Sequence, residues 1–284
     1  MSDSAPSGRP GPARTPIALT VAGSDSSGGA GIQADLKTFS AFGVYGTSVV
    51  TALTAQNTRG VQGVEAVSAG FVAAQLDSVL SDLDVRAIKT GMLADASIVE
   101  TVARRLRALP RLDLVVDPVM VATGGDVLLQ PDAIGAFRSA LAPLATLVTP
   151  NLEEAAVLLG AAKAESEAHM RDQARALLAL GCRAVLVKGG HGGGAEAVDV
   201  LADAAGCETF ASPRIDTPHT HGTGCTLSAA IAALLAQGVA VADAVRRAKA
   251  FVWQGLQAGR ALGVGGGRGP VDHLFAIRRG APPA

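Results

Sequence analysis

The chain has 284 residues, of which 49% are hydrophobic and 17% are charged, and its formal net charge is −1. That composition is enough for a large core, and the lack of a basic block excludes nucleic acid as an expected partner. Three cysteines, Cys182, Cys207 and Cys225, are odd in number and far apart. They form neither a disulfide framework nor a zinc pattern, so we expect a reducing compartment and a cytoplasmic protein.

The first fifteen residues are Pro, Gly, Ser and Arg with almost no apolar material, which predicts a disordered tail over 1–15. A signal peptide with 17–22 as its apolar region is excluded, because that run is short and leads directly into Gly23-Ser24-Asp25. Residues 17–276 contain no repeat and no linker, so we expect a single domain over 16–280. The apolar helix predicted from Thr226 to Val241 is built mostly of Ala, which indicates a core helix and no membrane span.

Short apolar runs alternate with helical patterns along the rest of the chain. The predicted strands are 17–22, 47–55, 86–90, 112–116, 147–149 and 183–187, with a hairpin at 197–202 and 208–211. The predicted helices are 32–42, 68–83, 95–109 capped by Asp95, one from Pro131, one after Pro150, 165–180, 226–237 and 241–261. This alternation predicts an α/β fold with a mostly parallel sheet covered on both faces.

Several functional side chains follow directly on predicted strand ends, the edge at which such sheets bind ligands. They are Asp25, Gln56, Met92, Asp117, Asn151 and Lys188. Pro118 favours extended backbone at Asp117 and holds it at the strand tip. Lys188 follows a buried Val-Leu-Val run, where its charge needs an anionic partner; the alternative is a lysine that extends to the surface. Asp25 could equally be a turn residue or a helix N-cap.

The segment Asp216-Thr-Pro-His-Thr-His221-Gly-Thr-Gly-Cys225 is a glycine loop that leads into a helix with Gly238 at its end. Gly222 and Gly224 can adopt backbone angles closed to other residues, and the unpaired N–H groups of the helix start form an anion site. A tight turn before a buried helix is the alternative. The strand-end residues favour the first interpretation, in which the loop binds a phosphoryl group that is being transferred.

Phosphoryl transfer needs positive charge, N–H donors, magnesium and aligned reactants. Lys188 provides a cation, and Asp117 and Glu154 could hold Mg²⁺ through waters. No Gly-Lys dipeptide, His-Arg-Asp or Asp-Phe-Gly occurs, which excludes a Walker A loop and a protein kinase. Gly29-Ala-Gly-Ile-Gln-Ala34 fits a dinucleotide fingerprint, but no acidic residue lies between Asp35 and Glu65 to bind the ribose.

These motifs together resemble the ribokinase-like superfamily and, within it, the hydroxymethylpyrimidine/phosphomethylpyrimidine kinases. The motifs that carry the resemblance are Ala22-Gly-Ser-Asp-Ser-Ser-Gly-Gly-Ala-Gly-Ile-Gln-Ala-Asp35, Thr51-Ala-Leu-Thr-Ala-Gln-Asn-Thr58, Lys89-Thr-Gly-Met-Leu93, Asp117-Pro-Val-Met120, Thr149-Pro-Asn-Leu-Glu-Glu-Ala155, Lys188-Gly-Gly190 and His221-Gly-Thr-Gly-Cys-Thr226. They span nearly the whole chain after the tail. Near the end, Arg268 and Asp272 stand where the family is expected to have His and Asn.

The resemblance implies a three-layer α/β/α fold without the large lid of sugar kinases, and a homodimer. It implies two successive ATP-dependent phosphorylations of 4-amino-5-hydroxymethyl-2-methylpyrimidine in thiamine biosynthesis, with Mg²⁺ as cofactor. The site residues implied are Asp25 and Gln56 on the aminopyrimidine; Met92 and Val119 beside its ring; Asn151, Glu154 and Asp117 near magnesium and phosphate; Lys188, Asn151 and Thr223 on the nucleotide; and Gly222, Thr223, Gly224 and Cys225 as the anion hole.

The ribokinase-like superfamily often has an Asp as catalytic base at the position of Cys225. A cysteine at this position is typical of the pyrimidine kinase branch. A thiol at a helix start is expected to ionise more readily than a free cysteine, whose pKa is about 8.5. Cys225 could then accept the proton of the substrate hydroxyl in the first step. The alternative is that it only packs at the helix start.

Two other functions stay open on the sequence. A pyridoxal or pyridoxine kinase shares the cysteine and a flat heteroaromatic substrate with a hydroxymethyl group. A non-catalytic pyrimidine or vitamin sensor would keep Asp25 and Gln56 but would not need Lys188, Glu154 and the glycine loop. His219 and His221 suggest a metal, but with no third ligand nearby we expect packing or hydrogen-bonding roles.

Overall fold

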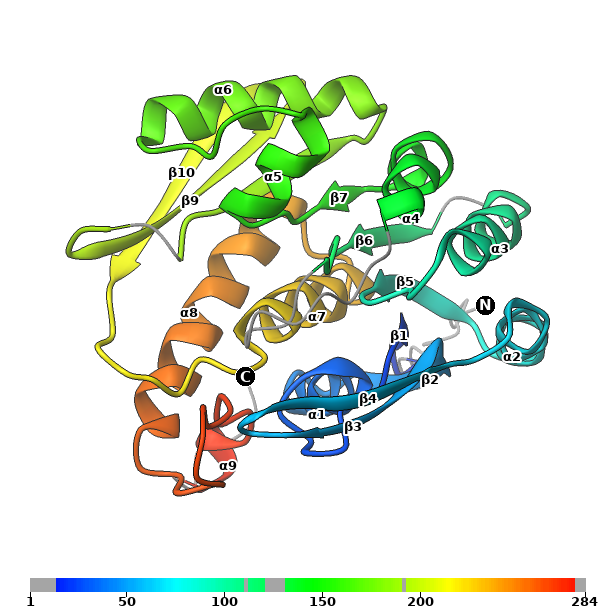
Figure 1. Cartoon of the computed structure of the whole chain (residues 1–284), viewed down its shortest axis with the longest axis horizontal. Coiled ribbons are helices and arrows are strands. Elements are labelled where there is room, and N and C mark those ends of the chain that lie inside the picture. The colour runs from blue at the N-terminus through cyan, green and yellow to red at the C-terminus, as the bar shows by residue number, and fades with distance from the viewer. Residues whose placement is uncertain (1–13, 110–111, 121–130, 191–192, 279–284) are drawn as a thin grey trace, which may run out of the picture.

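A mostly parallel sheet of eight strands runs through the computed structural model, which describes residues 14–109, 112–120, 131–190 and 193–278 (Figure 1). In spatial order its strands are β10 (Gly206–Pro213), β9 (Glu196–Asp203), β8 (Ala184–Lys188), β7 (Leu147–Val148), β6 (Asp113–Val116), β5 (Val85–Thr90), β1 (Ile17–Ala22) and β2 (Tyr45–Val50). The six strands from β8 to β2 are parallel, whereas β9 is antiparallel to both β8 and β10. The hairpin predicted from the sequence is the β9–β10 pair.

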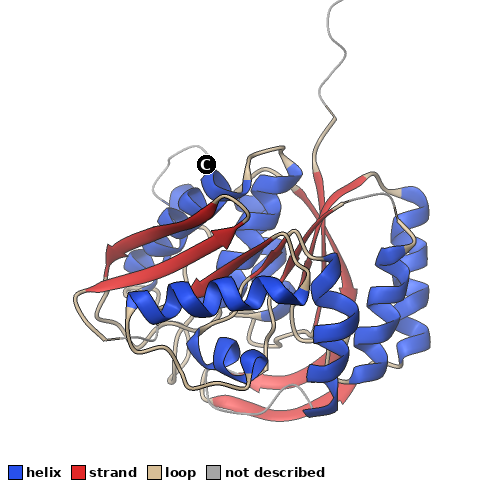
Figure 2. Ribbon diagram, turned by 90° about the horizontal axis from the view of Figure 1, so that it is seen from above, coloured by secondary structure: helices blue, strands red, loops and turns tan. Residues whose placement is uncertain are grey.

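Helices cover both faces of this sheet, which gives the three layers seen from above in Figure 2. One face carries α1 (Gly31–Ala41), α7 (Thr223–Ala236), α8 (Val241–Gly259) and the short α9 (Phe275–Arg278). The other face carries α2 (Ala69–Asp82), α3 (Ala96–Arg107), α4 (Pro131–Ala136), α5 (Leu152–Leu159) and α6 (Glu167–Leu177). The predicted three-layer α/β/α architecture with a mostly parallel central sheet is therefore confirmed.

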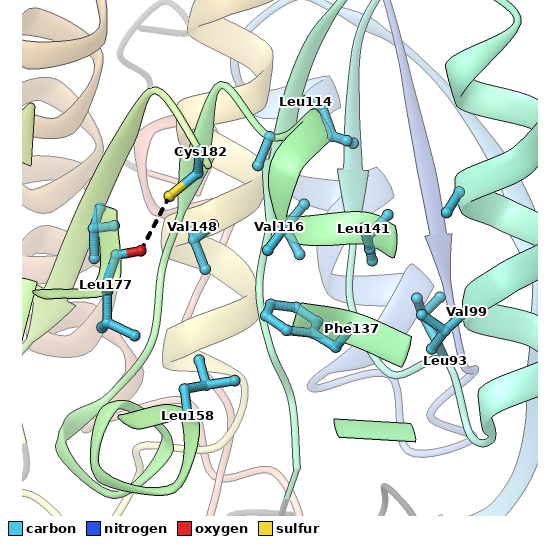
Figure 3. Packing of buried hydrophobic residues seen from close by; sticks show 14 of the residues in the cluster. Leu93, Val99, Leu114, Val116, Phe137, Leu141, Val148, Leu158, Leu177 and Cys182 are labelled. Atoms are coloured by element: carbon cyan, nitrogen blue, oxygen red, sulfur yellow. Dashed lines mark hydrogen bonds between the residues drawn. The ribbon is translucent and has the colours of Figure 1, made fainter. Parts of the chain in front are cut away.

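Side-chain alternation along the strands divides the apolar residues between two cores. In β1, Leu19 and Val21 belong to the core under α2–α6, while Ala18 belongs to the core under α1, α7 and α8. Successive side chains of a strand point to opposite faces, so a strand buried on both sides reads as a continuous apolar run. Figure 3 shows part of the first core, where Phe137 packs near Val116 and Leu141.

The strand predicted over 47–55 is wrong in its extent, because the chain breaks between β2 and a second strand, β3 (Ala52–Asn57). Thr51 at the break donates its hydroxyl to the carbonyl of Met92 at 2.6 Å, which fixes the turn away from the main sheet. β3 then pairs antiparallel with β4 (Gly60–Ala66) as a separate ribbon. No strand was predicted at β4, because this strand is mostly exposed and so lacks the apolar pattern of a buried one.

The helix predictions hold with small shifts at the ends. Asp95 caps α3 by accepting from the N–H of Ile98 at 2.9 Å, and Gly238 adopts a φ of 83° just past the end of α7. Residues 1–13 of the predicted tail lie outside the described residues, and the single domain over 16–280 stays a prediction. None of the helices in the described ranges has the length and apolar composition that a membrane span needs.

Candidate active site

A cavity of about 640 Å³ opens at the carboxyl ends of the parallel strands. The residues predicted from the sequence all line it: Asp25, Gln56, Met92, Asp117, Val119, Asn151, Glu154, Lys188, Gly222, Thr223, Gly224 and Cys225. They come from seven separate segments, five of which follow the ends of parallel strands at one edge of the sheet, while Gln56 comes from the β3–β4 ribbon and 222–225 from the start of α7. The location of these residues at one cavity is as predicted.

The glycine loop is built around Gly222, which has a φ of 77° and precedes the first residue of α7. A Cβ on Gly222 would lie 1.9 Å from the carbonyl oxygen of Gly29, so no other residue fits there. Gly224 does not share this conformation: α7 begins at Thr223, three residues earlier than predicted, and places Gly224 in its first turn. A Cβ on Gly224 would lie 3.4 Å from Lys188 Nζ, so this glycine keeps the backbone open beside the lysine.

The start of α7 presents backbone donors to the cavity. First-turn N–H groups have no acceptor within their own helix. That of Thr223 donates to the carbonyl of Thr220 at 3.2 Å, and the Thr223 hydroxyl donates to the same carbonyl at 2.7 Å. The backbone N–H groups of Gly224 and Cys225 have no acceptor in the described part of the chain. Together with the helix dipole they form a site for an anion.

Lys188 and Asp117 form an ion pair on the floor of the cavity. Lys188 Nζ donates to Asp117 Oδ1 at 2.8 Å, and the two side chains are 13% and 2% exposed. The hydroxyls of Thr149 and Ser228 donate to the Asp117 carboxylate at 3.0 and 3.1 Å. Burial alone would raise the pKa of Asp117, but Lys188 and Lys89 outweigh it and lower that pKa. Lys188 therefore does not extend to the surface; its charge stays at the cavity, as predicted.

Asn151 and Glu154 form a capping box at the start of α5. The Asn151 side chain accepts from the N–H of Glu154 at 2.8 Å, and Glu154 Oε2 accepts from the N–H of Asn151 at 2.7 Å. Glu154 is 6% exposed. Burial first, and then the nearby Asp117 carboxylate, raise the pKa of Glu154 to about 7 despite the opposing charge of Lys188. The Asn-x-x-Glu motif is thus a helix N-terminus that faces the cavity with a carboxyl group half protonated near neutral pH.

Asp117 and Glu154 fit a magnesium ion only in part. Their oxygens are the hard ligands that Mg²⁺ prefers, but one oxygen of Asp117 already accepts from Lys188 Nζ at 2.8 Å. Within the described ranges, however, no three His, Cys, Asp or Glu side chains gather closely enough to hold a metal by themselves. These two residues therefore suit an ion that also has water and phosphate ligands.

Asp25 organises the loop between β1 and α1. Its Oδ1 accepts from the N–H and the hydroxyl of Ser27 at 2.8 and 2.7 Å. Its Oδ2 accepts from the N–H groups of Gly29 and Ala30 at 3.0 and 2.8 Å and lies 2.8 Å from His221 Nε2. Burial raises the pKa of Asp25, but the hydrogen bond with His221 and those with Ser27 and Ala30 outweigh it and lower the pKa to about 2. The turn-residue interpretation is confirmed, and contact with a substrate stays a prediction.

Gln56 reaches the cavity from the β3–β4 ribbon. Its Oε1 accepts from the Thr54 hydroxyl at 3.1 Å, and its backbone N–H donates to Ser26 Oγ at 2.9 Å. No acceptor in the described ranges faces its NH₂ group, which is left for a ligand. Met92 and Val119 follow the ends of β5 and β6 and line the same cavity, and Met92 is 7% exposed.

The two histidines of the glycine loop make hydrogen bonds, as predicted. His221 bonds Asp25 and so joins the glycine loop to the β1–α1 loop. His219 Nδ1 accepts from the N–H of Gly269 at 3.0 Å. The described residues supply no further ligand for a metal at this position.

Cys225 differs from its prediction. Its side chain lies half-buried at the cavity, and burial raises the pKa of its thiol to about 11. Asp35 and Asp117 also raise this pKa, while Lys89 and a hydrogen bond from the backbone of Gly31 lower it without compensating. The prediction that the helix start would make Cys225 unusually acidic is therefore wrong. Sequence reasoning counted the helix dipole but not the desolvation of the thiol or the two nearby carboxylates.

Two charged pairs at the cavity escaped the sequence reasoning. Lys89 and Asp35 are fully buried and bonded to each other. Lys249 Nζ donates to Asp199 Oδ2 at 2.6 Å, and the other oxygen of Asp199 accepts from the N–H of Gly189 at 2.9 Å. The available signal was a charged residue inside a strand or helix pattern that was otherwise apolar, as in Arg86-Ala-Ile-Lys89-Thr90.

An apolar wall next to the Lys249 pair was also missed; it consists of Pro213, Ile215, Val252, Trp253 and Leu256.

Comparisons with known proteins agree with this geometry. The family model of phosphomethylpyrimidine kinase matches residues 25–272. A hydroxymethylpyrimidine/phosphomethylpyrimidine kinase from Rhizobium meliloti is 57% identical over 260 residues, which are 92% of this chain and 97% of that protein. A thiamine biosynthesis bifunctional protein from Geobacter sulfurreducens is 50% identical over 91% of this chain and 52% of its own length. The crystal structure of an ADP complex of Bacillus subtilis pyridoxal kinase has a TM-score of 0.85 at 41% identity, covering 93% of this chain and 99% of that one.

The raised pKa of Glu154 makes stability depend on pH. The folded protein keeps the Glu154 proton up to about pH 7, whereas the unfolded chain loses it near 4.5. Because the folded state binds more protons in this window, its free energy of unfolding falls as pH rises through it. Glu154→Gln retains the capping box but cannot ionise. We expect the variant to gain about 2–3 kcal/mol over the wild type between pH 5 and pH 8, measured by urea unfolding.

Glu153→Gln is the matched control, because the neighbouring Glu153 carboxylate is 55% exposed and binds Lys163 at the surface. This variant should follow the pH dependence of the wild type. If Glu154→Gln does the same, Glu154 is ionised throughout and its pKa is not raised.

Proposed function

Because the chain belongs to the phosphomethylpyrimidine kinase family, we propose that it transfers the γ-phosphoryl group of ATP to 4-amino-5-hydroxymethyl-2-methylpyrimidine and then to the resulting monophosphate, in thiamine biosynthesis. The observation that carries this proposal is the single cavity in which the glycine loop, Lys188 and the Asp117–Glu154 pair meet Gln56, Met92 and Val119. One end offers cationic and N–H groups for phosphates, and the other offers an amide and apolar walls for a small ring.

The pyrimidine ring would bind between Met92 and Val119. The NH₂ group of Gln56, which has no acceptor among the described residues, would donate to a ring nitrogen. The carboxylate of Asp25 already accepts five hydrogen bonds, so we propose that it acts mainly by holding its loop and His221 in place. A contact between Asp25 and the exocyclic amino group would be an additional bond to an already ionised carboxylate.

The nucleotide phosphates would bind between the start of α7 and Lys188, with Thr223 and Asn151 at the edges. The N–H groups of Gly224 and Cys225 are positioned for the transferring phosphoryl oxygens. Asp117 and Glu154 would hold Mg²⁺ through waters, and the ion would neutralise charge on the phosphates. The apolar wall with Trp253 would then receive the base of the nucleotide.

The two steps differ in what the nucleophile requires. In the first, the hydroxymethyl oxygen attacks the γ-phosphorus, the bond from that phosphorus to the bridging oxygen of ADP breaks, and the hydroxyl proton must leave. We propose that Cys225 accepts this proton through the ionised fraction of its thiol, which a pKa of about 11 keeps small at neutral pH. In the second step, an oxygen of the substrate monophosphate attacks. The second pKa of a phosphate monoester is about 6, so this oxygen needs no protein base at neutral pH.

A pyridoxal kinase is the second candidate within the same chemistry. The pyridoxal kinase fold matches this chain with a TM-score of 0.85, and pyridoxal is also a flat ring with a hydroxymethyl group. A non-catalytic pyrimidine or vitamin sensor is disfavoured, because such a protein would not need the Lys188–Asp117 pair or the glycine loop. The cytoplasm remains our proposed compartment, since none of the three cysteines is paired.

A second copy of the chain would pack on the segment 45–71. Four of the seven large hydrophobic side chains that the described residues expose lie there: Tyr45, Leu53, Val64 and Phe71. They belong to β2, β3, β4 and the start of α2, so an interface at the ribbon would also support Gln56 in the same strand. We therefore propose a homodimer.

Steady-state kinetics with hydroxymethylpyrimidine, its monophosphate and pyridoxal side by side test the substrate. We expect both pyrimidines to react with a higher kcat/KM than pyridoxal, and a preference for pyridoxal would overturn the proposal.

Gln56→Ala should weaken pyrimidine binding by about 1–3 kcal/mol in calorimetry and leave ATP binding unchanged. Lys188→Ala should weaken ATP binding and leave pyrimidine binding unchanged, so the two variants control for each other.

Cys225→Ser tests the base role through the ratio of the two steps. We expect it to slow the first phosphorylation by roughly 100-fold or more, as for loss of a general base. The second phosphorylation should change little, because its nucleophile is already ionised. Single-turnover rates at saturating ATP and magnesium measure both. Parallel losses would show that Cys225 only supports the glycine loop.

Leu53→Arg tests the dimer. Leu53 is 53% exposed on β3, and a charge there should prevent close packing of two copies. We expect sedimentation equilibrium to give a dimer for the wild type and a monomer for the variant. Val157→Arg, at a residue 48% exposed on α5, is the control and should remain dimeric. A monomeric wild type at micromolar concentration would refute the proposal.

A further inference from the structure

Residues 265–273 join two parts of the cavity that lie far apart in the sequence. This segment follows α8 and contacts both the turn of the β3–β4 ribbon and the glycine loop (Figure 1). It contains Arg268 and Asp272, the two positions at which the sequence departs from the family pattern, and the proposed chemistry does not use it. Its contacts with both parts are backbone hydrogen bonds and glycines that pack directly on neighbouring atoms.

On the ribbon, the segment binds Thr58 in the turn between β3 and β4. The N–H of Gly267 donates to the Thr58 hydroxyl at 3.1 Å, and the N–H of Arg268 donates to the Thr58 carbonyl at 2.8 Å. A Cβ on Gly267 would lie 2.1 Å from that carbonyl oxygen, and a Cβ on Gly265 would lie 2.3 Å from the hydroxyl oxygen. Glycine at both positions therefore lets the segment approach the ribbon closely.

On the glycine loop, the segment binds His219 and His221. The N–H of Gly269 donates to His219 Nδ1 at 3.0 Å, and the carbonyl of Gly269 accepts from the N–H of His221 at 3.2 Å. The N–H of Val271 then donates to the carbonyl of His221 at 3.3 Å, which makes a short parallel bridge. His221 directly precedes Gly222 and the anion site at the start of α7. The bridge thus fixes the chain where that site begins.

The end of the segment is anchored in the helix layer. The N–H of Asp272 donates to the carbonyl of Gly255 on α8 at 3.1 Å. His273 Nε2 lies 2.9 Å from the hydroxyl oxygen of Thr226 on α7. Asp272 and His273 are each 4% exposed. The segment is therefore fixed to the core and can hold both the loop and the ribbon in place.

The ribbon needs such a support, because a two-stranded hairpin is only marginally stable by itself. β4 is mostly exposed, so packing contributes little to holding the ribbon. Ser26 binds the ribbon at Gln56, whose N–H donates to the Ser26 hydroxyl oxygen at 2.9 Å. The 265–273 segment holds the turn two residues further on, at Thr58. Gln56 is thus placed by two supports, and one of them is shared with the glycine loop.

We propose that the 265–273 segment aligns the pyrimidine with the transferring phosphoryl group, with Thr58 and His219 as positioning residues through which it does so. The inference rests on the proposed function, in which Gln56 binds the pyrimidine and the glycine loop binds the phosphates. Because one segment holds both, the approach of the substrate hydroxyl to the γ-phosphorus depends on it. A misplacement of about 1 Å can slow a reaction by about 100-fold.

Gly267→Ala tests the contact with the ribbon, because its Cβ would force the segment away from the Thr58 carbonyl. We expect kcat to fall by about tenfold or more, and each KM to change by a smaller factor. Both phosphorylations should slow, since both need alignment, whereas Cys225→Ser should slow only the first. Gly266→Ala is the matched control: its Cβ would lie 3.1 Å from Nη2 of Arg59, the end of a flexible side chain. An unchanged kcat in Gly267→Ala, or an equal loss in Gly266→Ala, would overturn the proposal.

His219 tests the contact with the glycine loop. His219→Ala removes the acceptor for the N–H of Gly269, whereas His219→Asn retains an acceptor oxygen on Cγ, where histidine carries Nδ1. We expect His219→Ala to slow both phosphorylations and His219→Asn to restore most of the rate. If both variants are equally slow, or both match the wild type, the positioning role of His219 fails.

Hydrogen–deuterium exchange measures the coupling without activity. Gly267→Ala adds an atom at the ribbon, yet we expect faster exchange in residues 52–66 and also in residues 216–225, where the N–H of His221 is bonded to Gly269. Gly266→Ala should match the wild type in both segments. Faster exchange confined to the ribbon would show that the segment does not couple the two parts, and would overturn the inference.

The buried strand β8 is the internal reference in this experiment. Faster exchange there would report global unfolding of Gly267→Ala, and the two His219 variants then decide. If the wild type phosphorylates neither pyrimidine, the proposed function fails while exchange still decides whether ribbon and loop are coupled. If the wild type is active and Gly267→Ala changes neither kcat nor exchange, the inference fails while the kinase proposal stands.

Discussion

The constraint on which the site depends is that a buried charge needs a partner. Lys188 with Asp117 and Lys89 with Asp35 bring two cations to the closed end of the cavity, where ATP phosphates would bind. Each lysine is kept ionised by a carboxylate that is itself buried and hydrogen-bonded to a hydroxyl. Glu154 is the exception, a third carboxyl with a pKa raised to about 7. The cavity therefore combines two fixed ion pairs with one acid, Glu154, that can still respond to a cation.

A second principle is that the two ligand loops support each other. His221 in the glycine loop bonds Asp25 in the β1–α1 loop, and the positive φ of Gly222 brings the chain against the carbonyl of Gly29. The two loops proposed to bind the substrate and the phosphates are thus coupled by one hydrogen bond and one close backbone approach. A kinase benefits from this arrangement, because the hydroxyl and the phosphoryl group must be aligned before transfer.

Much of this arrangement could be predicted from the chain. The buried strands β1, β5, β6 and β8 follow from apolar runs, and polar residues at their ends identified the cavity edge. The β3–β4 ribbon could not be predicted in this way, because its exposed residues lack a buried pattern. The acidity of Cys225 was misjudged for a related reason: a helix start is visible in the sequence, but the burial of the thiol and the carboxylates beside it are not.

The sequence by itself determined the alternation of helices with the buried strands, the parallel sheet, and hence the edge at which Asp117, Asn151 and Lys188 lie. These properties are local, since periodicity and strand-end residues are written in a few consecutive positions. Only the tertiary structure decided which charges meet. Lys89 is 54 positions from Asp35, and Lys188 is 71 from Asp117. Pairing and pKa depend on distance and desolvation in the packed core, which no local pattern encodes.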